Sequence, residues 1–410
     1  MSEIWLVRHG ESEANAEGVW QGQADARLNA RGREQAERLG ARLAGHSFDL
    51  VVASDLQRTA ATAAAAGLQA EPDPAWRELD LGRWEGLTSA EVMARYPQEM
   101  QALMAGEDVP IGGGETWGGF CARVDAAVEG LAARLGEGER ALVVTHGGFI
   151  GAGGFIGAYL SGLLRFRARP RPWPVEHPAN TAVTVILTGN GGPRLRTLND
   201  ATHLAPAPPV GPHGTVVGLA RHGESVANLG DVWPGTTDGP LSERGQRQGA
   251  ELAARYDAVE YVYTSHLQRA RLTAAAFSSG RGVEPKVHPG LHEIDFGTWE
   301  GLTTNQIRER FPEEWEDTRR LDVPRGGTGE TVAGAGARLC RAVEEIAAAH
   351  PGERVLVFTH GGIIRACVGA VIGLGLEVRD LFEGPANASV THLRVGRHGT
   401  AVVDYNLGVV

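Results

Sequence analysis

The sequence predicts an α/β protein of two tandem three-layer domains, each a mostly parallel sheet with helices on both faces. Short apolar runs alternate with longer helical patterns along the chain, which is typical of parallel strands covered by helices. The chain also repeats itself, because the run from Leu6 to Ser12, which ends in Arg-His-Gly-Glu-Ser, recurs from Leu219 to Ser225. Its 410 residues exceed a typical domain of about 100–200 residues, so the chain is long enough for two cores.

Three further elements repeat in the same order. A Leu-Gln-Arg triplet ends at Arg58 and at Arg269, a glutamate precedes Trp-Glu-Gly at positions 78 and 293, and Thr-His-Gly-Gly contains His146 and His360. The offsets between the copies are 213 residues for Arg-His-Gly, then 211, 215 and 214. A period this constant predicts one fold present twice: domain 1 over residues 1–204, a Pro- and Gly-rich extended linker over 205–214, and domain 2 over 215–410.

Within the first copy, each element is justified by its local pattern. Short apolar runs predict strands at residues 4–7, 50–53, 141–145 and 181–187, the last alternating as an edge or antiparallel strand does. Helical composition predicts helices at 30–44, 56–66 and 117–135, and a further helix from Thr88. Ser54 or Asp55 is the candidate N-cap of the helix at 56–66. Thr88 and Glu91 form a capping-box pattern, and the second copy follows the same order.

Charge and composition narrow the function classes. The net charge of −11 argues against a general binder of nucleic acid or anionic membranes, although two arginines in a cleft would still suit an anionic substrate. Residues 141–164 contain one ionisable side chain, but seven glycines interrupt them, so we expect a buried strand and a packed helix rather than a membrane span. Three widely spaced cysteines provide no metal or disulfide framework and are expected to be small apolar side chains. With no visible signal peptide, they favour the cytoplasm. The oligomeric state stays open.

Each copy therefore carries two histidines, two arginines and a glutamate. Because sites in parallel sheets form at the carboxyl ends of strands, His9 and His146 are expected to meet at one edge. Arginines offer planar donor forks for phosphate oxygens, and their charge favours the neutral, nucleophilic form of a nearby histidine. A glutamic acid can protonate a leaving alkoxide, and water can then attack the phosphohistidine. This chemistry needs no metal and no cofactor.

These motifs resemble the histidine phosphatase superfamily, also called the phosphoglycerate mutase-like family, over nearly all of both halves. The resemblance implies that His9 and His222 are the phosphorylated nucleophiles and that Glu78 and Glu293 are the proton donors. It implies that the phosphate of a small phosphorylated substrate is bound by Arg8, Asn15, Gln21, Arg58 and His146 in the first copy and by Arg221, Asn228, Arg269 and His360 in the second. The Trp-Glu-Gly after each proton donor is similar to the broad-specificity phosphatase branch, so we expect metal-independent phosphomonoester hydrolysis.

Two alternatives remain at this point. One is a phosphoglycerate mutase, which returns the phosphoryl group to its substrate. The other is a second half that binds a phosphorylated ligand without turnover, because Pro234 replaces Gln21 and proline cannot donate a hydrogen bond. The arginine-rich run at 165–171 is interpreted as a solvated loop, or else as a surface binding strip or a rim of the first pocket that selects acidic substrates. His392 stands at an apolar strand position with no evident partner.

Overall fold

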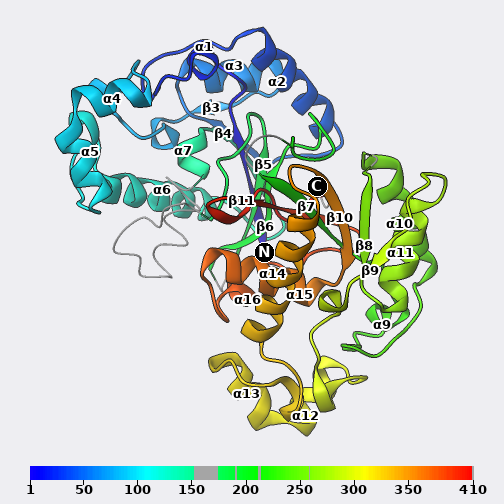
Figure 1. Ribbon diagram of the computed structural model, residues 1–410. Helices are drawn as coiled ribbons and strands as arrows, with labels where there is room; N and C mark the ends of the chain where they lie inside the picture. The colour runs from blue at the N-terminus through cyan, green and yellow to red at the C-terminus, as the bar shows by residue number, and fades with distance from the viewer. Residues whose placement is uncertain (152–173, 190–191, 211–213, 258, 409–410) are drawn as a thin grey trace. The chain divides into compact units, whose positions relative to one another are not determined.

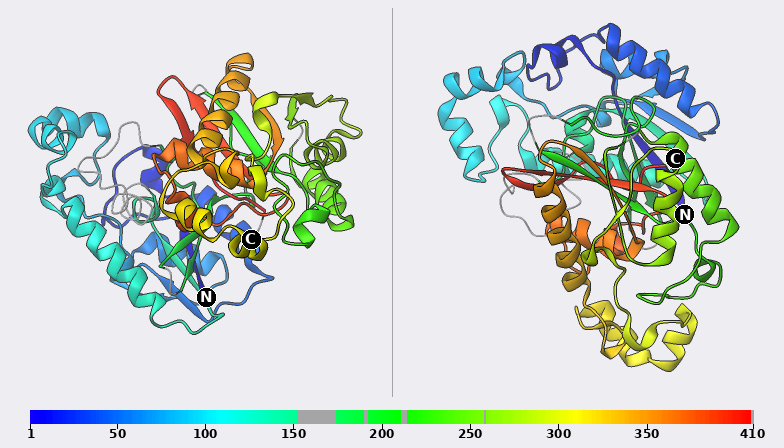
Figure 2. Two further views of the ribbon diagram at one scale, coloured as in Figure 1. Left: turned by 90° about the horizontal axis from the view of Figure 1, so that it is seen from below. Right: turned by 45° about the vertical axis from the view of Figure 1, so that its right-hand side comes forward.

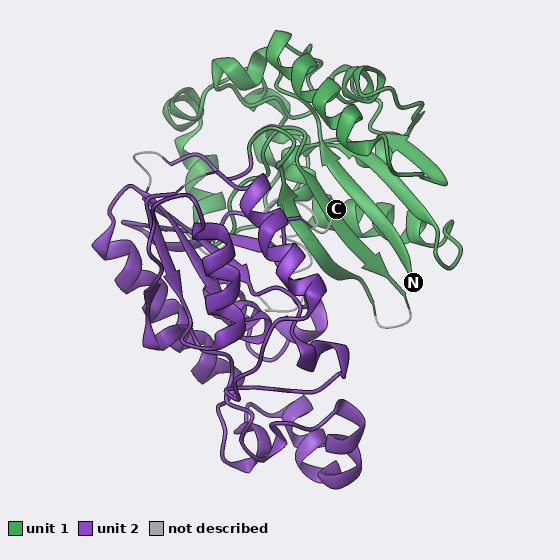
Figure 3. Ribbon diagram, turned by 90° about the vertical axis from the view of Figure 1, so that its right-hand side faces the viewer, with its two compact units in different colours: residues 1–205 green, residues 206–410 purple. Residues whose placement is uncertain are grey.

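The computed structural model describes residues 1–151, 174–189, 192–210, 214–257 and 259–408. The chain divides into two compact units, Met1–Ala205 and Pro206–Val410 (Figure 3). Within the described residues, each unit is built around one six-stranded sheet.

The first sheet has the strand order β3-β2-β4-β1-β5-β6. Its strands are β1 (Ser2–Arg8), β2 (Leu50–Ala53), β3 (Glu71–Pro72), β4 (Arg140–Thr145), β5 (Val183–Thr188) and β6 (Arg194–Asp200). Strands β1, β2, β3 and β4 pair in parallel, whereas β5 pairs antiparallel with both β1 and β6. The predicted strand at 181–187 is therefore antiparallel and not at the edge, and all six residues of β5 are buried, so the alternation in its sequence did not mark an exposed face.

Helices surround this sheet at the predicted places. The α-helices are α1 (Glu13–Glu17), α2 (Ala30–Leu43), α3 (Gln57–Ala65), α4 (Ser89–Arg95), α5 (Pro97–Met104), α6 (Trp117–Ala132) and α7 (Gly147–Ile150). Short 3-10 helices are η1 (Pro74–Trp76), η2 (Gly82–Trp84) and η3 (Ile111–Gly113). The capping box at Thr88 and Glu91 is confirmed. The N-cap prediction for α3 was wrong: Leu56 is the N-cap, without a side-chain hydrogen bond, because Ser54 and Asp55 bond to other side chains.

The second unit repeats this topology, with the strand order β12-β11-β7-β10-β8-β9. Its strands are β7 (Thr215–Arg221), β8 (Tyr261–Thr264), β9 (Lys286–Val287), β10 (Arg354–Thr359), β11 (Val390–Gly396) and β12 (Gly399–Val402). Its α-helices are α9 (Val226–Leu229), α10 (Glu243–Arg255), α11 (Gln268–Ser278), α12 (Thr304–Arg310), α13 (Pro312–Arg320), α14 (Val332–Ala349), α15 (Gly361–Ile372) and α16 (Val378–Leu381). Its 3-10 helices are η4 (Pro289–Leu291), η5 (Gly297–Trp299) and η6 (Arg325–Gly327).

The layers are clearest in the second unit. Helices α10 and α11 pack together on one side of the strands and α14 and α15 on the other, while α12 and α13 form a small lobe away from the sheet (Figures 1 and 2). The central strands β7 and β10 are almost wholly buried between these helices, as expected for parallel strands covered on both faces. The predicted fold class, two tandem α/β domains with mostly parallel sheets, is confirmed.

The Pro- and Gly-rich segment after the first unit makes contacts with the second. Ala207 is buried within a core cluster of that unit. The carbonyl oxygens of Pro208 and Pro209 accept hydrogen bonds from Arg354 at 2.8 Å and Arg394 at 3.2 Å. Ala207 and the carbonyl groups of Pro208 and Pro209 thus fix the start of this segment to the second unit.

Candidate active site

The two motif histidines of each unit meet at the carboxyl edge of the sheet. His9 follows β1 and His146 follows β4, and these neighbouring parallel strands are in register from Glu3 with Arg140 to Arg8 with Thr145. The ring centroids of His9 and His146 are 5.3 Å apart. In the second unit, the rings of His222 and His360 are 5.1 Å apart. The strand arrangement thus brings together residues that are 137 or 138 positions apart in sequence.

The first histidine of each pair is held in one orientation and one tautomer. His9 Nδ1 lies 2.7 Å from the carbonyl oxygen of Gly10, and His222 Nδ1 lies 2.6 Å from that of Gly223. Because a carbonyl oxygen only accepts, Nδ1 carries the proton in each case and the lone pair of the neutral ring is on Nε2. Both rings are almost fully buried, with 3% of their surface exposed. Nε2 is therefore the nucleophilic atom.

The second histidine is anchored by a serine that the sequence analysis did not place in the site: Ser54 was considered only as an N-cap, and Ser265 was not considered. His146 Nε2 lies 2.9 Å from Ser54 Oγ, and His360 Nε2 lies 2.9 Å from Ser265 Oγ. Ser54 follows β2, which is the neighbour of β4, and Ser265 follows β8, which is the neighbour of β10. The same sheet edge therefore supplies the serine and the histidine of each pair. Matching Ser54 with Ser265 across the repeat, at the same offset of 211 as the nearby arginines, is the signal that would have found them.

Two buried arginines lie beside the histidines. Arg58 is fully buried on α3, and its Nη1 and Nη2 donate to the carbonyl oxygens of Ala24 and Gly22 at 2.8 and 2.7 Å. Arg269 repeats these bonds with Thr237 and Gly235, and its Nε donates to His360 Nδ1 at 3.2 Å. Among the residues that the structure describes, backbone carbonyls rather than carboxylates orient both guanidinium groups, and no direct ion pair neutralises their charge.

Arg8 and Arg221 end the first strand of each sheet in the same way. Arg8 Nη1 donates to the carbonyl of Pro178 and Arg221 Nη1 to that of Pro385, both at 2.6 Å. Among the described residues, the buried nitrogens Arg8 Nε, Arg58 Nε and His146 Nδ1 have no hydrogen-bond partner.

These charges control the titration of the histidines. Burial, followed by the positive charges of Arg58 and Arg8, lowers the pKa of His9 well below its ordinary value. Burial and Arg58 lower the pKa of His146 in the same sense, and burial with Arg221 does so for His222. All three rings are therefore neutral near pH 7.

The glutamate of each unit lies against the turn that follows the second histidine. Glu78 accepts hydrogen bonds from its neighbour Leu79 N at 2.9 Å and from Gly148 N, in the turn after His146, at 2.8 Å. Burial raises its pKa, against the opposing effects of these hydrogen bonds and of Arg58 and Arg8. Glu293 accepts from Ile294, Gly362 and Ile363 N at 2.9, 3.0 and 2.8 Å.

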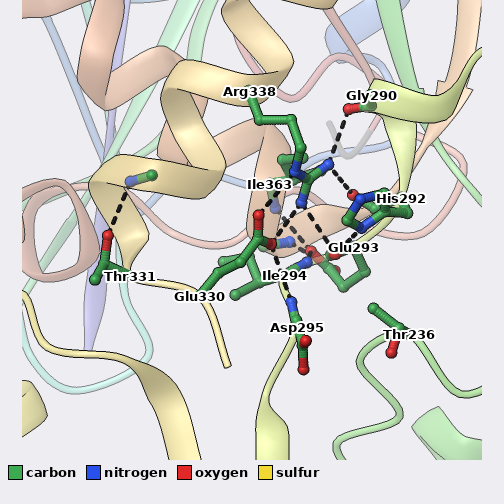
Figure 4. A network of polar contacts seen from close by, with 12 residues as sticks. Thr236, Gly290, His292, Glu293, Ile294, Asp295, Glu330, Thr331, Arg338 and Ile363 are labelled. Atoms are coloured by element: carbon green, nitrogen blue, oxygen red, sulfur yellow. Dashed lines mark hydrogen bonds and ion pairs between the residues drawn. The ribbon is translucent and has the colours of Figure 1, made fainter. Parts of the chain in front are cut away.

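The same arrangement occurs within each of the two units and holds the backbone of this glutamate in place. Arg338, on α14, donates to the carbonyls of Gly290, His292 and Glu293 and forms a bidentate pair with Glu330 at 2.8 and 2.6 Å (Figure 4). Arg123 makes the same clamp in the first unit with Glu115 and the carbonyls of Ala75, Arg77 and Glu78. Sequence reasoning missed this pair because its partners are mostly backbone atoms.

The predicted phosphate-binding amides also have structural roles. The Oδ1 of Asn15 caps α1 by accepting from Ser12 N, and Gln21 Oε1 accepts from Ser12 Oγ at 2.8 Å. Asn180 Nδ2 donates to the carbonyl of His9 at 2.9 Å and also to Asn15 Oδ1 at 3.4 Å. Asn228 and Asn387 repeat the cap and the two contacts in the second unit. A repeated Pro-Ala-Asn triplet in the sequence could have identified Asn180 and Asn387.

The rims of the two sites differ. In the first unit, Arg77 and Asp55 form a bidentate ion pair at 2.7 and 2.6 Å. At the matching positions of the second unit stand His292 and His266, whose rings are 5.9 Å apart.

The arginine-rich run at 165–171 lies outside the described residues, so its interpretations stay predictions. In the part of the chain that the structure describes, no cluster of three or more His, Cys, Asp or Glu side chains has an arrangement suited to a metal ion, and no helix is long and apolar enough to cross a membrane.

A buried pair of neutral histidines flanked by arginines and a glutamate, at the carboxyl edge of an α/β sheet, is typical of enzymes that handle phosphoryl groups on histidine. The family model "Histidine phosphatase superfamily (branch 1)" matches residues 4–201 and again residues 217–408. The chain belongs to this superfamily, and both halves carry the family's domain.

Several proteins resemble this chain over about half its length. "Phosphoglycerate mutase-like protein 4" of Arabidopsis thaliana is 36% identical over 50% of this chain and 87% of its own length. "Phosphoserine phosphatase 1" of Hydrogenobacter thermophilus is 28% identical over 46% of this chain and 90% of its own length. Among solved structures, YhfR of Bacillus stearothermophilus is 30% identical and covers 46% of this chain and 95% of its own, with a TM-score of 0.43.

Proposed function

We propose that this protein is a metal-independent phosphomonoesterase that acts on small phosphorylated metabolites through a phosphohistidine intermediate. One observation carries the proposal. Each unit contains a buried, neutral histidine whose Nε2 carries no proton, and this histidine lies beside two arginines and a glutamate. Relatives named as phosphoserine phosphatases in Hydrogenobacter thermophilus and Arabidopsis thaliana support phosphatase chemistry.

In the first step, His9 Nε2 attacks phosphorus while the bond from phosphorus to the leaving oxygen breaks. Arg8 and Arg58 donate to the phosphoryl oxygens, and His146 and Asn15 add further donors. Burial raises the pKa of Glu78, which favours the protonated form, and this form can give its proton to the leaving oxygen. Water then attacks the phosphohistidine, Glu78 takes the water's proton, and phosphate leaves with His9 restored. His222, Arg221, Arg269, Asn228 and Glu293 take the same parts in the second unit, whereas His360 Nδ1 accepts from Arg269 Nε and so positions that arginine.

The direct test is rapid-quench trapping with a ³²P-labelled substrate. Wild-type protein is expected to retain acid-labile, base-stable label, and His9→Ala with His222→Ala is expected to abolish it. Label that remains in the double variant, or none in the wild type during turnover, would remove the phosphohistidine from the mechanism.

Two observations keep second candidates in view. Relatives named as probable phosphoglycerate mutases, such as one from Enterobacter that is 38% identical over 36% of this chain, make a mutase the nearest alternative. Faster interconversion of phosphoglycerates than hydrolysis would favour it.

Pro234 in place of Gln21 makes a binding-only second half the other candidate. Phosphate release by each single variant, His9→Ala and His222→Ala, decides whether one half or both turn over. A cytoplasmic location stays a prediction.

A further inference from the structure

Two of the three cysteines, far apart in sequence, are in direct contact. Cys340 on α14 and Cys367 on α15 have their Sγ atoms 2.8 Å apart. This separation is shorter than that of carbon atoms in van der Waals contact, about 3.5–4.0 Å. Because a disulfide bond is about 2.05 Å long, the sulfurs need to approach by less than about 1 Å to be joined. We propose that Cys340 and Cys367 are a redox modification site, at which a hydroperoxide converts the two thiols into an intramolecular disulfide that joins α14 to α15.

The two thiols differ in the way such a reaction requires. Cys340 is partly exposed, whereas Cys367 is fully buried. The hydrogen bond with Cys340, followed by burial, raises the pKa of the Cys367 thiol well above its usual value. Cys340 is therefore the sulfur that an oxidant reaches first. Cys367, whose Sγ lies 2.8 Å away, resolves the intermediate because of this proximity and loses its proton in that step.

The step balances with hydrogen peroxide as the oxidant. The Cys340 thiolate attacks one peroxide oxygen, so a sulfur–oxygen bond forms, the oxygen–oxygen bond breaks, and the departing hydroxide takes up a proton as water. Cys367 then attacks the sulfenic sulfur, which forms the disulfide and releases the second oxygen as water with the remaining proton. Two thiols and one peroxide give one disulfide and two waters, and the sulfurs lose the two electrons that the peroxide gains.

The cross-link would join the two helices that hold Glu293. Arg338, two residues before Cys340 on α14, holds the backbone carbonyl of Glu293, and the first turn of α15 holds its carboxylate. Cys367 lies seven residues after His360, which is about two helical turns from the site. The bond would fasten this frame without touching a reacting group, so we expect it to stabilise the second unit and to leave its turnover unchanged at moderate temperature.

The first unit provides an internal control. At the positions that match Cys340 and Cys367 it has Asp125 and Gly153, so the same cross-link cannot form there. Its one cysteine, Cys121, lies elsewhere on α6 and serves as a reference thiol.

The experiment uses the full chain, first fully reduced and then treated with hydrogen peroxide. Thiol titration under denaturing conditions is expected to fall from three thiols to one, with a mass loss of two hydrogens and a Cys340–Cys367 linked peptide on non-reducing mapping. Cys340→Ser and Cys367→Ser are expected to form no such peptide. Oxidised protein that keeps all three thiols, or links that involve Cys121 or a second chain, would overturn the proposal.

The stabilising effect has its own readout. With the first site silenced by His9→Ala, phosphate release after heating follows the second unit alone, a readout that rests on the proposed turnover by that unit, whereas the thiol titration and peptide mapping do not. The oxidised form is expected to lose this activity with a half-life about tenfold longer than the reduced form. The Cys340→Ser variant is expected to show no difference between the two treatments, and an equal difference in that variant would assign the effect to another oxidised group.

Discussion

Glu78→Gln tests the division of labour within the first site most sharply. It is made in a His222→Ala background, so that only the first site turns over. Glutamine keeps the shape of the side chain but cannot give a proton to a leaving oxygen. Loss of a general acid typically costs about 10²–10⁴ in rate, which is about 2.7–5.4 kcal/mol of transition-state stabilisation. We expect this loss in kcat/KM for alkyl phosphates, whose leaving oxygen needs the proton. An aryl phosphate with a good leaving group is expected to lose far less.

The same substitution has a stability cost that can be worked from the contacts. The carboxylate of Glu78 accepts two backbone hydrogen bonds, from Leu79 N at 2.9 Å and Gly148 N at 2.8 Å. The glutamine amide has one oxygen, so one of these N–H groups would face an NH₂ group, at a cost of about 1–3 kcal/mol. Thermal unfolding measures this cost and verifies that the variant is folded at the assay temperature. Equal losses for the alkyl and aryl phosphates in a folded variant would refute proton donation by Glu78.

Four further outcomes are expected. The site histidines have pKa values held well below 6.5, so they stay neutral in the folded state, while the histidines of the unfolded chain take up protons below that pH. The urea concentration at the midpoint of unfolding should therefore fall when the pH is lowered from 7.5 to 5.5. An unchanged midpoint would contradict the neutrality of these histidines. Gln21→Pro should lower kcat/KM of the first site about 10–100-fold and Pro234→Gln should raise that of the second, if this amide donates to phosphate; no change in either would make Gln21 a loop residue. Arg338→Met should destabilise the second unit by about 2–4 kcal/mol in chemical unfolding and lower its kcat, whereas a purely structural clamp would leave kcat intact. Thr88→Ala removes a capping box and should cost about 1 kcal/mol without changing kcat/KM, a useful control for folding effects.

The sequence located the site because strand ends are readable. His9 and His146 each follow a run of apolar residues, and parallel strands bring their carboxyl ends to one edge, so their meeting could be predicted without coordinates. The supporting residues were not readable in this way. Asn180 acts on the backbone carbonyl of His9, and Arg123 acts on three carbonyls of the loop before α4, contacts that leave no mark in hydropathy or spacing.

The failed N-cap prediction has a related cause. Ser54 and Asp55 have residue types suited to capping, but α3 begins at Gln57, so Leu56 is at the N-cap position, and the two side chains bond to His146 and Arg77 instead. A local capping rule assigns one partner to each polar group, whereas the folded chain offers several. The bond to a charged or buried partner forms, because leaving that partner unpaired costs more free energy. Local capping rules are therefore least reliable next to the site itself.

His392 shows how two copies of one fold can differ in the core without differing in topology. Its ring is fully buried, with Nδ1 at 2.8 Å from both carboxylate oxygens of Asp404 and Nε2 at 2.7 Å from the hydroxyl of Tyr256. Opposite it on β7 is Gly218, where an added Cβ would come within 2.9 Å of that hydroxyl. The first unit has Trp5 at the glycine's position, paired with an apolar valine.

The first unit thus has the large ring of Trp5 where the second unit has Gly218, and the second unit has the polar triad of His392, Asp404 and Tyr256 beside that glycine. The four residues depend on one another, because a buried histidine without Asp404 and Tyr256 would be unsatisfied, and any side chain at position 218 would displace the hydroxyl. Taken alone, His392 and Gly218 look like errors in apolar strands. Their pairing in the sheet, together with Tyr256 after α10 and Asp404 after β12, explains why a polar residue stands there.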